Sequence, residues 1–151
     1  MSWSSYVNEN LYFARLQLDS SSSEPFRPRQ IAAETAAVLF LERAYYGFLN
    51  ELAHKRKIKE TVNNLEDLER HLELESAEVR ALKALKSDNG WLEYLLKLVA
   101  LSRQPRAELS QQGELGLIAV SSGEGASLNL CQLHALMKQT IEELRETSTE
   151  W

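Results

Sequence analysis

The stretch that decides the fold is residues 30–54, QIAAETAAVLFLERAYYGFLNELAH. At 100° per residue, its apolar side chains fill a contiguous half of a helical circumference. The main members of this apolar sector are Ile31, Ala33, Ala37, Val38, Phe40, Leu41, Ala44, Tyr45, Phe48, Leu49 and Leu52. A sector this wide is typical of a helix that neighbouring helices cover on several sides. We therefore expect a long central helix over about residues 29–57, inside a helical bundle.

The boundaries of this helix carry their own signals. Pro28 suits the entry, because its missing N–H would lack an intrahelical acceptor there in any case. Residues 55–57, Lys-Arg-Lys, suit the exit, where cations meet the negative end of the helix dipole. Glu34 is one turn from the start, and we interpret it as a partner of the dipole rather than as a buried functional carboxylate. A narrow strip of small and polar residues lies opposite the apolar sector: Ala32, Ala36, Arg43, Gly47, Asn50 and His54.

Length and composition indicate one globular domain over residues 1–151. The chain is 44% hydrophobic and 26% charged, values that are ordinary for a folded protein and argue against disorder. Its net charge of −5 gives the surface no general attraction for nucleic acid or anionic lipid. Cys131 is the only cysteine, so the chain has neither an intrachain disulfide nor a cysteine cluster for a metal.

The sequence also predicts a cytoplasmic location. The first ten residues, MSWSSYVNEN, lack the basic and apolar blocks of a secretory signal. No uncharged apolar run reaches the length of about 18 residues that would span a membrane. The longest apolar stretch is interrupted by Glu34, Glu42 and Arg43. We therefore expect no contact with membranes.

Apolar residues at helical spacing predict a first helix from residue 4 to about residue 20. Asn10 and Gln17 project into its apolar face, and we interpret them as structural amides that hydrogen-bond inside the bundle or at its edge. The alternative is an amide pair that faces a ligand. The serine run at 20–23 is expected to form a loop.

The segment NENLYFARLQLD, residues 8–19, is followed by this polar break and by an alanine-rich helix with aromatics. In this order the elements resemble a family of small uncharacterised bacterial proteins, a domain of unknown function. The resemblance covers about the first third of the chain. It implies an all-helical fold and brings no activity, cofactor or site residue with it.

After the central helix, residues 64–87 allow one helix or two. Asn63 and Glu66 have the spacing of a capping box, and Ser76 could cap a second helix. A single helix would put Glu75 in a core position, so two short helices are favoured. A further apolar helix is expected at residues 91–103, and a last one from about residue 128 to 147.

Residues 104–127 make a long connection between the last two helices, with a possible short extended segment near 115–120, LGLIAV. The expected fold class is therefore all-α, a bundle of five or six helices around the central one.

Glu51 and His54 form a Glu-x-x-His pair on the central helix. Ferritin-like di-iron bundles use that pair twice, together with two more carboxylates. Neither His71 nor His134 has a glutamate three residues earlier. A mononuclear site made by the three histidines is conceivable geometrically. Three scattered histidines also arise by chance, so we expect neither a metal nor another cofactor.

Two further motifs suggest a function, but neighbouring residues argue against each of them. Residues 121–127, SSGEGAS, follow the possible extended segment and precede a helix, as a phosphate-binding loop does. No Lys-Ser/Thr follows the glycines, and Glu124 would repel an anion. The run 54–59, HKRKIK, could contact RNA, but acidic residues follow within ten positions. Helical ribonucleases of toxin systems carry an arginine upstream of a histidine at a spacing that no histidine here shows. We therefore expect no nucleic-acid partner.

Tyr12 and Leu16 are neighbours one turn apart on the otherwise polar side of the first helix. Leu39 and Tyr46 form a second apolar group outside the main sector of the central helix. Adjacent exposed apolar residues often mark a contact surface, and two-fold dimers are the commonest oligomers. We therefore expect a homodimer that uses the first helix.

The favoured function is a non-catalytic helical interaction or regulatory module that binds itself or another protein. The alternative is a small-molecule or metal-binding enzyme or carrier with a site inside the helical bundle. An enclosed polar cavity would favour the alternative, and an exposed apolar patch would favour the interaction module.

Overall fold

The computed structural model describes residues 2–72, 76–106 and 129–149. Those residues contain six helices and no strand. In order they are α1 (Trp3–Ser23), α2 (Arg27–Lys55), α3 (Leu65–His71), α4 (Ala77–Lys86), α5 (Trp91–Ser102) and α7 (Leu130–Thr149). The all-α class and the two separate helices within residues 64–87 are confirmed. The possible extended segment at 115–120 and the glycine loop at 121–127 lie outside the described residues.

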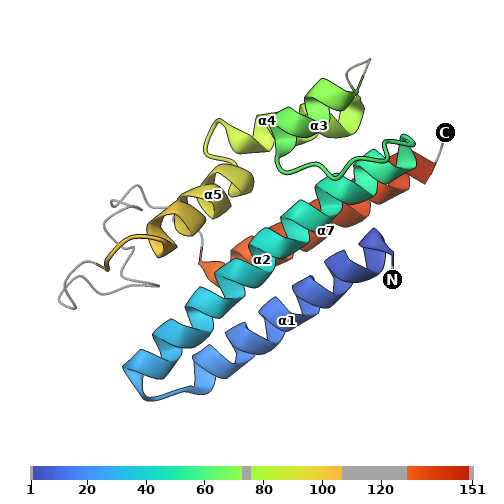
Figure 1. The fold of residues 1–151 in the computed structure, drawn as a ribbon. Helices are drawn as coiled ribbons and strands as arrows, with labels where there is room; N and C mark the ends of the chain where they lie inside the picture. Colours follow the sequence, from blue (N-terminus) through green and yellow to red (C-terminus); the bar gives the residue numbers. More distant parts are fainter. Residues whose placement is uncertain (1, 73–75, 107–128, 150–151) are drawn as a thin grey trace.

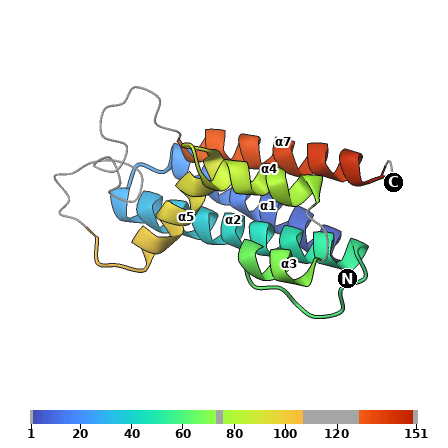
Figure 2. The ribbon, with the colours of Figure 1, turned by 90° about the horizontal axis from the view of Figure 1, so that it is seen from above.

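Three long helices run side by side (Figure 1). α1 and α2 form an antiparallel hairpin, and α7 packs against both. As a result, the start of α1 and the ends of α2 and α7 meet at one end of the bundle, as Figure 1 shows. Of the three shorter helices, α3 and α5 contact α2, α4 contacts α3 and α5, and α5 also contacts α7 (Figure 2).

The core confirms the wide apolar sector of α2. Val38, Leu41, Ala44 and Leu49 are fully buried, and side chains of all six helices join one hydrophobic cluster. Such packing makes α2 the shared wall of the bundle. Phe40 is half-buried beside Phe13 of α1, with ring centroids 5.4 Å apart.

The strip of small and polar residues on α2 is partly buried. Gly47 is buried beneath α1, where an added Cβ would lie 2.7 Å from Cδ1 of Tyr6. Asn50 is buried against the segment that follows α2. Its side chain donates to the carbonyl oxygen of Val62 and accepts from the amide of Val62, each over 2.9 Å. Both residues therefore hold neighbouring parts of the chain against α2.

The serine run at 20–23 is helical and was not predicted to be. The hydroxyl of Ser21 donates to the carbonyl of Leu18, and that of Ser22 donates to the carbonyl of Asp19. These bonds to the preceding turn are compatible with helix, so α1 continues to Ser23. The chain turns into α2 only at Glu24, ahead of Pro25.

Two other expectations need correction. The cap of α3 is Asn64, whose side chain accepts from the amide of Asp67 over 2.7 Å, so the capping pair begins one residue later than the predicted Asn63 and Glu66. Glu34 is buried, and it lies 3.7 Å from the guanidinium of Arg27. The predicted cap at Ser76 is confirmed, because its hydroxyl accepts from the amide of Val79.

Candidate functional site

The three histidines lie on three different helices and do not converge. His54 is exposed near the end of α2. His71 is the last residue of α3, and its ring contacts the backbone oxygen of Asp67. His134 is buried in α7. Among the described residues, no group of three or more His, Cys, Asp or Glu side chains could hold a metal ion. Within the described residues, the three histidines therefore do not form the mononuclear site that was geometrically conceivable.

His134 instead joins two helices. Its Nε2–H donates to the carbonyl oxygen of Leu11 over 2.9 Å, which ties α7 to the middle of α1. Burial lowers the pKa of His134, and the bond to Leu11 opposes that shift. The charges of Arg15 and Lys138 lower this pKa further, whereas that of Asp19 raises it. The neutral ring is the form that suits this interface.

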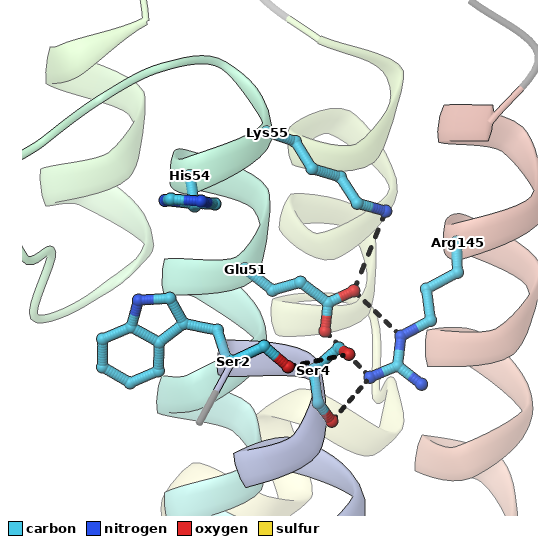
Figure 3. A pocket seen from close by; sticks show the side chains of 7 residues that line it. Ser2, Ser4, Glu51, His54, Lys55 and Arg145 are labelled. Atoms are coloured by element: carbon cyan, nitrogen blue, oxygen red, sulfur yellow. Dashed lines mark hydrogen bonds and ion pairs between the residues drawn. The ribbon is translucent and has the colours of Figure 1, made fainter.

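Glu51 is buried and held by cations from two helices. Its carboxylate accepts two bonds from Arg145 of α7, from Nε over 2.9 Å and from Nη2 over 2.8 Å. Nζ of Lys55, one turn further along α2, lies 3.8 Å away. Figure 3 shows the carboxylate between these two side chains. Glu51 therefore pairs with the protein's own cations rather than with His54.

Arg145 also binds α1. Its Nη1 donates to the side-chain oxygen of Asn8 over 2.9 Å, and Nη2 lies 3.5 Å from the carbonyl oxygen of Ser4. One guanidinium thus joins α1, α2 and α7 at the end of the bundle where they meet (Figure 3). A bidentate pair of this kind fixes geometry as well as charge.

An open cleft of about 390 Å³ lies over this ion cluster. Its wall contains Glu51, His54, Lys55 and Arg145, together with residues 2–4 at the start of α1. Its size is within the range of small-molecule sites, but it lies at the end of the bundle and opens to solvent. The cleft therefore differs from the enclosed interior site that a carrier or enzyme of the expected kind would need.

Polar side chains in the bundle interior are satisfied internally. Within the described ranges, no buried side-chain nitrogen or oxygen lacks a hydrogen-bond partner. The buried amide of Asn10 donates to the carbonyl of Tyr6, so it has the structural role expected of it. The carboxylate of Glu78, which is also buried, lies 3.3 Å from Nη2 of Arg56. Arg56 belongs to the basic run at the end of α2. These polar groups therefore make structural contacts within the bundle.

The outer face of α1, by contrast, carries exposed apolar side chains. Tyr12 is 60% exposed and Leu16 is 44% exposed, one turn apart. The buried side of the helix is formed by Val7, Leu11, Ala14 and Leu18, so the two side chains point away from both α2 and α7. Of the second apolar group, Leu39 is exposed, whereas Tyr46 is half-buried beside the ring of Trp3.

Sequence reasoning named Glu51 as a candidate metal ligand and Tyr12 as a contact residue, but it did not single out Arg145. The signal for Glu51 was its spacing to His54, whereas its actual partners are Lys55 at i+4 and an arginine 94 residues away. The i, i+4 spacing of Glu51 and Lys55 was visible in the sequence. No pattern in the sequence of α7 indicated which of its residues would face Glu51.

The chain belongs to a family of unknown function, DUF6586, whose model matches residues 1–151. No curated protein and no solved structure matches the chain. None of the described helices is long and apolar enough to cross a membrane.

Proposed function

We propose that this protein is a non-catalytic interaction or regulatory module that forms a homodimer through the outer face of α1. The observation that carries the proposal is the exposure of Tyr12 and Leu16 as an adjacent apolar pair. Large apolar side chains are common on surfaces singly, but a contiguous pair on the otherwise polar side of a helix favours a contact. A second copy is the simplest partner, because two-fold dimers are the commonest assemblies.

The internal bonding of the charged residues also supports this proposal. Glu51, which belonged to the candidate metal pair, is engaged by Arg145, and His134 is engaged by the backbone of α1. Chemistry at either residue would require these bonds to break. The proposal includes a bacterial cytoplasmic location, supported by the family resemblance and by a composition with one cysteine.

Each copy would contribute only two large apolar side chains, so we expect a reversible dimer rather than an obligate one. Light scattering coupled to size exclusion should show a mass that rises from monomer towards dimer between about 10 and 300 µM, the weak-affinity range typical of small interfaces. The changes Tyr12→Glu and Leu16→Glu should each keep the protein monomeric, because a charge would be buried against the partner.

Leu39→Glu is the matched control. Leu39 is 41% exposed but lies on α2, so its replacement should leave dimerisation unchanged. A monomer mass at every concentration would contradict the proposal. So would a dimer that persists in both α1 variants.

A further inference from the structure

Six residues mark the outer face of α1 at the spacing of a coiled-coil seam. Successive members are separated by four, three, four, three and four positions, and all six are exposed. We call this set the α1 seam: Ser5, Glu9, Tyr12, Leu16, Asp19 and Ser23. Alternating steps of three and four residues keep side chains on one stripe of a helix, as in the core positions of a coiled coil. The seam runs nearly the full length of α1, from its third residue to its last.

The seam reads the same in both directions. From either end the order is serine, acid, apolar, apolar, acid, serine, and its midpoint lies at the level of residue 14. From this symmetry we infer that two copies of the protein pack their α1 helices antiparallel, with the two-fold axis between Tyr12 and Leu16. The inference rests on the proposed function, because it needs the dimer to form through α1.

This register covers both apolar positions of both chains. Tyr12 of one copy lies at the level of Leu16 of the other, so each contact combines a ring with a branched aliphatic side chain. A slip by one heptad would place each of these apolar side chains against serine or acid instead of against another apolar side chain. The two small serines at each end let the helices approach closely beyond the apolar centre.

The antiparallel direction is favoured over the parallel one by two effects. Antiparallel helices place the positive end of each dipole beside the negative end of the other. A parallel pair would set two tyrosine rings at one level and two leucines at the next, which fills the space less evenly. In the antiparallel pair, Glu9 approaches Asp19 of the second copy. Asp19 carries its own counter-charge, since Nε of Arg15 lies 3.2 Å from its carboxylate.

Site-directed crosslinking tests the direction. Ser5→Cys and Ser23→Cys are made separately in a Cys131→Ser background, because Cys131 is exposed and would otherwise react. The two proteins are mixed at a concentration where light scattering shows dimer and are treated with a short bismaleimide. The antiparallel seam predicts a crosslink between the two different variants and little product when either variant is treated alone.

The outcomes separate the inference from the function on which it rests. Crosslinking of Ser5→Cys with itself would indicate parallel helices and overturn the inference while leaving the dimer through α1 intact. A dimer with no crosslink in any combination would place the contact elsewhere and overturn both. A monomer mass in light scattering, for the variants and the unmodified chain alike, would also overturn both. Glu9→Cys mixed with Asp19→Cys, which probes the next level of the same seam, guards against a local effect at the helix ends.

Discussion

The two candidate surfaces of this protein differ in how their side chains are used. At the end of the bundle, Glu51, Lys55 and Arg145 are drawn together by bonds within the chain. On the outer face of α1, Tyr12 and Leu16 lie largely in water. The charged cleft resembles a site by residue type, yet its central charges hold three helices together. The apolar pair carries no charge, yet the fold leaves it uncovered.

This difference predicts opposite effects of mutation. Changes in the ion cluster should lower the stability of the monomer, because its bonds belong to the fold. Changes on the outer face of α1 should leave the monomer intact and alter only association. The predictions below start with the largest expected effect.

Arg145→Met should reduce the free energy of unfolding by about 3 kcal/mol, because it leaves the buried Glu51 carboxylate without its main partner. It also removes the links to α1 at Asn8 and Ser4. Urea denaturation measures the loss. Arg103→Met is the matched control, since Arg103 is 71% exposed and pairs with Glu42 at the surface, where such a pair contributes about 0–1 kcal/mol. Equal losses in the two variants would show that the cluster has no special structural role.

His134 should make stability depend on pH, because burial disfavours the protonated form of its ring in the folded protein. Its pKa is lowered from 6.5 in the folded protein, mainly by burial. Well above pH 6.5 both folded and unfolded forms carry a neutral ring, and the pH effect is absent. Below 6.5 the unfolded chain takes up a proton first, so stability should fall as the pH decreases, by at most about 1.4 kcal/mol per pH unit.

Urea denaturation at pH 7.5 and 5.5 checks this effect against His134→Gln. Glutamine can still donate to the Leu11 carbonyl but does not titrate, so the variant should lose less stability between the two pH values than the unmodified chain. Identical losses would show that other groups cause the pH dependence.

Tyr12→Ala and Leu16→Ala should change the stability of the monomer by no more than about 0.5 kcal/mol, the usual range for exposed positions. Denaturation at low micromolar concentration, where the monomer should dominate, measures this. A loss of several kcal/mol would mean that the pair packs within its own chain, and the contrast between the two surfaces would disappear.

Much of the fold could be predicted from helical periodicity alone. The wide apolar sector of residues 30–54 indicated a helix covered on several sides, and α2 differs from the expected span of about 29–57 by two residues at each end. The separate helices α3 and α4 could be predicted because Ser76 is a good N-cap and Glu75 is a poor core residue. These signals come from residues that are close together in the chain, so they can be read from a single sequence.

What could not be predicted depends on distant contacts. Gly47 and Asn50 lie in the small and polar strip opposite the apolar sector, and no pattern in the sequence indicated that Tyr6 and Val62 would contact them. The bond from Arg145 to Glu51 depends on the axial position of α7 against α2, and helical periodicity does not give that position. The exposure of Tyr12 and Leu16 could be predicted, because both lie opposite the apolar stripe of their own helix. That prediction does not require the positions of the neighbouring helices.

The most direct test of the central claim is a dilution series observed by ¹H–¹⁵N correlation NMR. If the protein associates through the outer face of α1, concentration-dependent shifts should cluster at residues 5–23 and be largest beside Tyr12 and Leu16. The amides around Glu51 and Arg145 should stay unchanged, and Tyr12→Glu should abolish the shifts. Spectra that do not depend on concentration, or shifts that cluster at the cleft instead, would contradict the claim.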